Sequence, residues 1–403
     1  MVIRETIPLL HDHHNHPSQY AAFFDSADLS EVKEKEKAIS IIEDNTEEET
    51  VNVVLGWNNS YYSFDRMDLK KLPPVIICNL SFHGFIHNKK AEDLVNERYE
   101  NPEILEKLED PAWMEANLPK IMKFLVEIEG LDEDKLDSLY DFYLEKGIWS
   151  IEDMLLPSEK ALQTFVSSGH SIRTDFWTTF PTYENLSKDA KKEIKGIKIF
   201  TDGALGPKTA ALNEKYPGEV EGELLHTEES LSELIEKIDK NKVSIHAIGD
   251  VAIKTVVQTL KDLDKKSIDL PETRIEHAQF IDEDTAKTAK SLGVILSMQP
   301  NFSMDSKHYS DRLSEKYLKK NNPFRMLIDE VGFIPGKDLI FGSDGMPHGV
   351  KPALESSLFP PYPSQKLTLQ EFIDGYCDPE NEGEIDLVID KDKKEVKIED
   401  ITF

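Results

Sequence analysis

Asp12-His13-His14-Asn15-His16 follows a short apolar run at residues 7–10, which has the composition of a β-strand. Side chains two positions apart in an extended strand lie on the same side, so His14 and His16 can reach one metal ion. A histidine pair of this kind is also compatible with a surface cluster or an expression tag. We favour metal binding because four later stretches each place another ligand-type residue at a predicted strand end.

From about residue 136 onward, apolar strand-like segments alternate with amphipathic helical segments. Predicted strands occupy residues 148–154, 171–179, 194–200, 243–248, 274–279, 294–299 and 339–342. This alternation is typical of parallel strands covered by helices. Candidate strands at residues 7–10, 51–57 and 74–80 bring the number of units close to eight. The sequence therefore predicts an α/β fold, and the number of units favours a closed (β/α)8 TIM barrel rather than an open sheet.

Four ligand-type side chains lie in or directly after these strands: Lys198, His246, His277 and Asp344. The C-terminal ends of barrel strands share one rim, so these residues should converge with His14 and His16. A buried Lys198 would be costly as an isolated charge, but tolerable as a neutral amine or as a carbamate that bridges two cations. Alternatively, Lys198 pairs with Asp202 or Asp344, and each single histidine could be a hydrogen-bonded core residue.

The composition limits what such a site can serve. The chain has 403 residues, 39% of them hydrophobic, and a formal net charge of −30, which argues against nucleic acid and anionic membranes as partners. Its two cysteines, Cys78 and Cys377, are too few for a disulfide framework and indicate a reducing compartment. We see no bilayer-spanning run and no signal peptide, and therefore expect a cytoplasmic protein with a small-molecule substrate.

We assign residues 1–352 to the barrel. Within them, the charged segment 89–137 is interpreted as a helical insertion or lid, or equally as a solvated elaboration without a role in chemistry. Residues 353–403 should hold the last barrel helix and a short acidic tail, whose low apolar content indicates partial disorder. Strand-like pieces at 385–389 and 395–398 suggest a β-sandwich remnant.

The same stretches resemble the motifs of a known superfamily. The segment from Asp12 to His16 resembles the Asp-x-His-x-His opening of the amidohydrolase superfamily. Four more resemble its third amidohydrolase family, which includes N-substituted formamide deformylases and exoenzyme-regulator-like proteins: Ile197-Lys198-Ile199-Phe200-Thr201-Asp202-Gly203-Ala204-Leu205-Gly206, His246-Ala247-Ile248-Gly249-Asp250, Arg274-Ile275-Glu276-His277-Ala278-Gln279 and Gly342-Ser343-Asp344. The resemblance extends to about Pro352. It implies a metal-binding barrel that hydrolyses C–N and related bonds.

The resemblance also implies roles for individual residues. The first metal would be held by His14, His16 and Asp344, the second by His246 and His277, with a carboxylated Lys198 between them. We expect one or two divalent ions, most readily Zn²⁺, with Fe, Mn or Ni as alternatives. Water on the metal would supply hydroxide for attack on a carbonyl carbon. Asp344 would pass the proton to the leaving nitrogen.

Seven further residues are candidates for contact with substrate or for support of the ligands: Asp12, Trp57, His83, Asp202, Lys208, Glu276 and Gln299. The three acidic residues flank ligands and are expected to orient imidazoles through the ring nitrogen not bound to metal. Trp57, His83 and Gln299 lie at predicted strand ends, where either substrate contact or plain rim packing is compatible with the pattern. Lys208 stands where many relatives carry Arg, and its point charge would hold an anionic group less rigidly.

Relatives usually carry a β-sandwich segment before the first strand, whereas only ten residues precede His11 here. We therefore expect a chain shortened at its N-terminus, with the sandwich absent or vestigial and with homodimerisation as a compensating source of stability. Two function classes follow. One is a metal-dependent hydrolase of amide, formamide or cyclic amide bonds; the alternative is a catalytically impaired regulatory or binding protein on the same barrel. Metal content discriminates between them.

Overall fold

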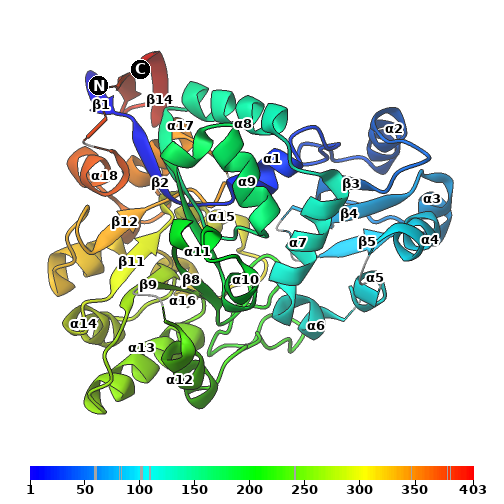
Figure 1. The fold of residues 1–403 in the computed structure, drawn as a ribbon. Coiled ribbons are helices and arrows are strands. Elements are labelled where there is room, and N and C mark those ends of the chain that lie inside the picture. The colour runs from blue at the N-terminus through cyan, green and yellow to red at the C-terminus, as the bar shows by residue number, and fades with distance from the viewer. Residues whose placement is uncertain are drawn as a thin grey trace. The chain divides into compact units, whose positions relative to one another are not determined.

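The computed structural model describes residues 1–58, 61–80, 82, 84–99, 103–108, 110–239, 242–345, 347–378, 380–381 and 383–403, without the side chains of residues 111 and 112. The chain forms two compact units. One consists of Met1–Pro17 and Asp137–Phe403, and the other of Ser18–Leu136. The second unit is coloured blue to cyan in Figure 1.

The first unit is built on a parallel barrel. Among the described residues its sheet has eight strands, in the order β2 (Leu10–Asn15), β6 (Ile148–Asp153), β7 (Thr174–Thr179), β8 (Ile194–Phe200), β9 (Lys242–Ala247), β10 (Glu272–His277), β11 (Ile295–Met298) and β12 (Leu339–Phe341). The backbone N–H of Asp344, just after β12, donates to the His14 carbonyl on β2 at 2.7 Å. Gly342 permits this approach, since a Cβ there would lie 2.4 Å from the His14 nitrogen. The barrel is thus nearly closed, and the predicted fold class is confirmed.

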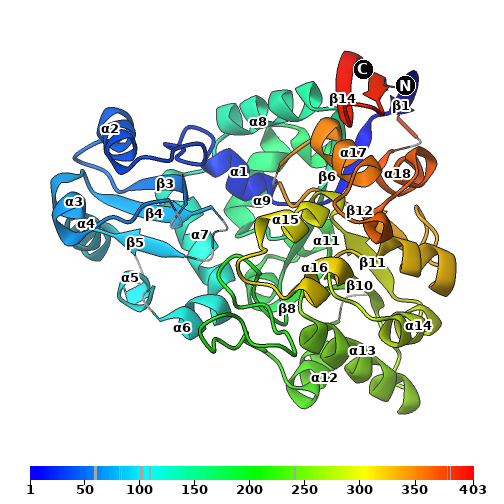
Figure 2. The same ribbon diagram turned by 180° about the vertical axis from the view of Figure 1, so that it is seen from behind.

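Helices cover the outside of the barrel strands, as Figures 1 and 2 show. They are α8 (Glu133–Glu145), α9 (Glu159–Ser167), α10 (Phe180–Asn185), α11 (Ala190–Glu193), α12 (Glu228–Lys237), α13 (Asp250–Lys265), α14 (Glu283–Ser291), α17 (Val350–Leu358) and α18 (Leu369–Tyr376). Local sequence sets their ends. The Asp282 side chain accepts a hydrogen bond from the Thr285 N–H at the start of α14, and Gly293 follows its end with φ +73°. Helix α13 buries Ile253 and Val256 toward the sheet layer.

A small antiparallel sheet joins the two ends of the chain. It contains β1 (Val2–Pro8), β13 (Glu384–Asp390) and β14 (Glu395–Thr402), with Ile7 opposite Ile385. Residues 384–402 are therefore ordered strands, which differs from the disorder that the acidic composition indicates. The reason is alternation: Ile385, Leu387 and Ile389 are buried while their neighbours remain more exposed.

The second unit has its own sheet, formed by β3 (Asn52–Trp57), β4 (Val75–Asn79) and β5 (Phe85–His87). Its helices are α2 (Lys35–Asn45), α3 (Arg66–Lys71), α4 (Lys89–Arg98), α5 (Glu103–Lys107), α6 (Pro111–Ala116) and α7 (Leu118–Glu129). The strands expected at 51–57 and 74–80 are present, but their assignment to the barrel is wrong. A buried apolar run has the same pattern in either sheet, so the sequence does not separate the two.

No helix within the described part of the chain combines the length and the apolar character needed to cross a membrane.

Candidate metal centre

Three predicted ligands meet where β2 and β12 end. His14 and His16 lie at the C-terminal end of β2, and Asp344 follows β12. The Asp344 Oδ1 atom lies 3.1 Å from His16 Nε2 and 3.7 Å from His14 Nε2. Ligand atoms from the three residues all lie within 4.8 Å of one another, which suits a single divalent cation. Asp344 has a φ of 56°, an uncommon conformation for a residue with a side chain.

The remaining predicted ligands lie beside this group. The His277 ring at the end of β10 is 4.7 Å from the His14 ring and 4.6 Å from the His246 ring of β9, measured between ring centroids. Lys198, inside β8, is buried, and its charge acts on both His14 and His277. The structure therefore brings the six predicted ligands to one rim, as expected for parallel strands that end together.

Lys198 is buried without a hydrogen-bonding partner. Its Nζ atom makes no hydrogen bond to any described residue. Burial lowers the pKa of Lys198 to about 8, although the charges of Glu276 and Asp344 oppose this shift. A pairing of this amine with Asp202, which the sequence also allows, is not among the contacts of the described residues. A buried amine that makes no hydrogen bond within the described part of the chain is energetically costly.

Hydrogen bonds fix which nitrogen of two histidines faces the site. His14 Nδ1 donates to Glu276 Oε2 at 2.6 Å, and His277 Nδ1 donates to Gln299 Oε1 at 2.7 Å. Both partners accept, so each ring keeps its proton on Nδ1 and presents the Nε2 lone pair. Glu276 thus occupies the orienting position that the sequence predicts, whereas Gln299 orients a ligand in addition to lying at the rim.

The hydrogen-bonded nitrogen of His246 is Nε2, whereas in His14 and His277 it is Nδ1. His246 Nε2 donates to the Gly203 carbonyl at 3.0 Å and lies 3.4 Å from Asp202 Oδ1, which leaves Nδ1 as the lone-pair nitrogen. The Asp202 carboxylate is held in turn by three backbone N–H groups, those of Ala211, Ile248 and Gly249. The loop after β8 therefore fixes the His246 ring.

The electrostatic environment favours the protonation states that metal ligands need. Burial and the charge of Lys198 lower the pKa of His14 to about 4, and burial with neighbouring His246 lowers that of His277 well below its ordinary value. Burial opposes ionisation of Asp344, but the charge of His14 and the hydrogen bond with His16 outweigh it and lower the pKa of Asp344. Near neutral pH these shifts leave His14 and His277 neutral and Asp344 ionised.

Asp12 does not orient an imidazole ring, the role that was expected for it. It links β2 to the segment that follows β12. Its carboxylate accepts from the backbone N–H of Ser343 at 2.8 Å, from the Ser343 hydroxyl at 2.5 Å and from Asn15 Nδ2 at 2.9 Å. Burial raises the pKa of Asp12 to about 6 against these bonds. Sequence analysis assigned no role to Asn15 or Ser343, although both lie inside the motifs.

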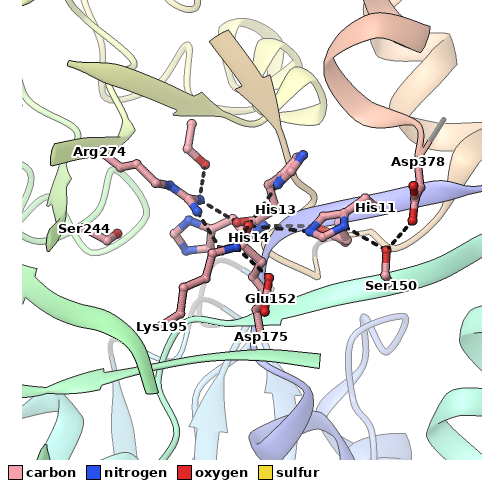
Figure 3. A network of polar contacts seen from close by, with 12 residues as sticks. His11, His13, His14, Ser150, Glu152, Asp175, Lys195, Ser244, Arg274 and Asp378 are labelled. Carbon is pink, nitrogen blue, oxygen red and sulfur yellow. Dashed lines mark hydrogen bonds and ion pairs between the residues drawn. The ribbon is translucent and has the colours of Figure 1, made fainter. Parts of the chain in front are cut away.

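A buried network of charges lies beneath the ligands (Figure 3). Arg274 Nη1 lies 2.6 Å from Glu152 Oε2, and Arg274 Nε lies 3.1 Å from Glu276 Oε1. Ser244 donates to the same Glu276 oxygen at 2.7 Å. Arg274 therefore supports the carboxylate that orients His14. This role was not expected from the sequence, because β10 and β6 each carry several polar residues and nothing local marks Arg274 and Glu152 as partners.

The other predicted residues lie elsewhere. Trp57 belongs to the second unit, where its Nε1 donates to the Tyr62 carbonyl and its ring packs on that unit's core. Lys208 occupies a turn after β8 with φ 68°, and its charge acts on Asp311. His83 lies outside the described residues.

Asp305 gives the barrel unit a measurable pH dependence. Burial raises its pKa from 3.8 to about 7, although Gln279 Nε2 donates to Asp305 Oδ2 at 2.7 Å. The folded protein therefore holds a proton that the unfolded chain releases, so this stabilisation is full below pH 4 and is lost as pH rises through 7. Asp305→Asn should remove this loss of stability at high pH. In urea unfolding, the free energy of unfolding of the variant relative to the unaltered protein should therefore increase from pH 4 to pH 8.

The control for this titration is Asp311→Asn. The pKa of Asp311 is lowered, chiefly by its hydrogen bond with Arg312, so its stabilisation is lost on acidification instead. The relative stability of this variant should fall, or stay constant, over the same range. A pH-independent difference for Asp305→Asn would contradict the assignment.

Comparisons with known proteins identify the family and the fold. The sequence model of the amidohydrolase family matches residues 4–352. A putative amidohydrolase, YtcJ, of Bacillus subtilis (strain 168) is 32% identical over 167 residues, which are 40% of this chain and 30% of that protein. The protein LONG AFTER FAR-RED 3 of Arabidopsis thaliana is 31% identical over 144 residues, 34% of this chain and 24% of that protein. The matches thus span less than a third of either relative.

Two solved structures share the fold. One, described as an uncharacterized metal-dependent hydrolase from Pyrococcus furiosus, superposes with a TM-score of 0.66 and 22% identity over 92% of this chain and 80% of that one. The other, described in the same way and from Pyrococcus horikoshii OT3, has a TM-score of 0.65 and 21% identity over 88% of this chain and 74% of that one.

Proposed function

Because this chain belongs to the amidohydrolase family, we propose that it is a metal-dependent hydrolase that acts on C–N bonds other than peptide bonds, in an amide, formamide or cyclic amide. The observation that carries the proposal is the meeting of six ligand-type residues from separate strands at one rim. They are His14, His16, Lys198, His246, His277 and Asp344. The net charge of −30 supports a small molecule rather than nucleic acid as the substrate.

The residues fit divalent cations. Each of the three rings at His14, His246 and His277 has one nitrogen bonded to an acceptor, which directs the other as a lone pair. His16 Nδ1 and Lys198 Nζ are buried and make no hydrogen bond among the described residues. His14, His16 and Asp344 would hold one ion, and His246 with His277 a second. Such ions, when bound, acidify water and polarise a carbonyl group.

Lys198 would complete the site as a carbamate. Carboxylation needs the neutral amine, which adds its lone pair to the carbon of CO₂ and releases one proton. Burial lowers the pKa of Lys198 to about 8, so a larger share of this amine is neutral near pH 7 than for an exposed lysine. The product would be an anionic carboxylate group on Lys198 Nζ. It would supply oxygen ligands for divalent ions and remove the unpaired buried charge.

Asp344 is the proposed proton carrier. Its side chain is 18% exposed, so substrate and water can approach it, and its lowered pKa keeps it ionised at neutral pH. The carboxylate would accept a proton from the attacking water and deliver it to the leaving nitrogen as the C–N bond breaks. His16, 3.1 Å away, holds the carboxylate in place.

The proposal is tested by metal content and by a His246→Ala variant. Protein purified without added metal should contain one or two transition ions per chain, and His246→Ala should lose metal and hydrolysis of an N-acyl and formamide panel together while keeping its circular dichroism spectrum. His308, which is exposed on α15 (Asp305–His308), provides the matched control His308→Ala. Retained hydrolysis in His246→Ala would rule out this site. Full metal without turnover in the unaltered protein would favour the regulatory alternative.

A further inference from the structure

We infer that a second divalent-cation site lies inside the N-terminal half of the barrel, with His11, His13 and Glu152 as its ligands (Figure 3). The strand β2 supplies both histidines, at residues where its register with β6 shifts. Glu152 lies on the adjacent strand β6. The buried Arg274, which bonds Glu152, separates this group from the ligands at the rim.

The three side chains have the spacing of a ligand set. Glu152 Oε1 lies 2.9 Å from His13 Nδ1 and 3.5 Å from His11 Nε2. The two imidazole rings lie side by side, with their centroids 4.1 Å apart. The Glu152 side chain is 1% exposed, whereas those of His11 and His13 are 21% and 22% exposed. The carboxylate is thus fixed in the interior, and the histidines leave a path for an ion from solvent.

Ser150 orients His11 as a ligand. The Ser150 hydroxyl donates to Asp378 Oδ2 at 3.4 Å and lies 2.8 Å from His11 Nδ1. Since the hydroxyl has one proton, His11 Nδ1 donates to it and His11 Nε2 carries a lone pair. That nitrogen is buried, lies 3.5 Å from Glu152 Oε1 and makes no hydrogen bond within the described part of the chain. Two electron-rich atoms directed at each other are the arrangement that a cation between them stabilises.

The ion would bind Glu152 Oε1 in place of the hydrogen bond that this oxygen makes with His13 Nδ1 at 2.9 Å. Glu152 Oε2 is already bonded to Arg274 and to Trp177 Nε1, each at 2.6 Å. Lys195 Nζ lies 3.2 Å from Oε1 and competes for that position, but it also lies 2.6 Å from Asp175 Oδ2. Lys195 would therefore keep a partner after the ion binds. Two imidazoles and one carboxylate favour Zn²⁺.

The site would act as a structural clip. It links the neighbouring strands β2 and β6, apart from the ligands at the rim. An ion that binds only the folded state raises the melting temperature. Zn²⁺ should therefore stabilise the barrel independently of any effect at the rim.

The experiment uses the full chain, stripped with a chelator and then reloaded with Zn²⁺. Bound ions are counted by mass spectrometry, and Co²⁺ absorption reports the ligand set. His11→Ala should bind one ion fewer per chain than the unaltered protein. Its melting temperature should also rise less when Zn²⁺ is added. The exposed-histidine control His308→Ala should match the unaltered protein in both measurements. Lys195→Met should bind Zn²⁺ about tenfold more tightly, since it removes the competing ammonium group.

Equal ion counts in His11→Ala and the unaltered protein would overturn the inference. If His11→Ala does not fold, Lys195→Met decides: unchanged Zn²⁺ affinity overturns the site and a tighter one supports it. If the rim centre does not bind metal, the number of ions per chain falls equally in the unaltered protein and in every variant. The difference of one ion between the unaltered protein and His11→Ala would remain, so the two proposals can be tested independently.

Discussion

An Asp344→Asn variant is expected to hydrolyse N-acyl and formamide substrates about 10²–10⁴-fold more slowly than the unaltered protein, the range associated with loss of a general acid–base group. The amide of Asn keeps the shape of the side chain but does not accept the proton of the attacking water. The Asp344 carboxylate contacts His14 and His16 and is 18% exposed, so it reaches solvent. The measurement is kcat at pH 7 to 8, together with metal content.

The control is Asp400→Asn, which removes an exposed carboxylate on β14. Its kcat should be unchanged. Metal content separates two causes in the Asp344 variant: slow turnover with full metal identifies the proton carrier, and slow turnover with lost metal identifies a ligand. A kcat within a factor of about three would contradict both roles.

Arg274→Met is expected to destabilise the protein by about 3–5 kcal/mol, the usual consequence of breaking a buried ion pair from one side. Glu152 and Glu276 are 1% and 0% exposed, and both would lose the Arg274 cation, although Lys195 would remain 3.2 Å from Glu152 Oε1. The pKa of each carboxyl is held well below its ordinary value, against burial, chiefly by the charge of Arg274. Urea unfolding at pH 7 measures the loss. Metal affinity should fall as well, because Glu276 orients His14.

Two variants check this interpretation. Arg4→Met removes an exposed arginine paired with Glu399 and should cost less than about 1 kcal/mol. The double variant Arg274→Met with Glu152→Gln should recover part of the stability, since it also removes one of the stranded charges. A cost for Arg274→Met no larger than that for Arg4→Met would show that the buried network contributes little.

Much of the barrel could be predicted from local patterns. The strand expected at residues 194–200 is β8 (Ile194–Phe200), and the helix expected from Asp282 is α14 with that residue as its N-cap. Both succeed because apolar runs and capping residues act within a few positions. The meeting of the ligands was predictable because parallel strands end together, which turns separation along the chain into proximity.

The errors have a physical cause of their own. The strands β3 and β4 carry apolar runs as regular as those of the barrel, yet they form a separate sheet in the second unit. Pairing partners are set by contacts distant in sequence, which a single strand does not encode. The same holds for Glu152 and Arg274: they lie on strands far apart in the sequence, and only the folded barrel makes them partners.

Anomalous diffraction from crystals of metal-replete protein would test the central claim most directly. The account predicts one ion within about 2.0–2.3 Å of ring nitrogens of His14 and His16, and a second ion beside His246 and His277. Extra density on Lys198 Nζ would show the carbamate between them. Crystals grown with excess Zn²⁺ that show no ion at this rim, or show these side chains bonded only to one another, would contradict it.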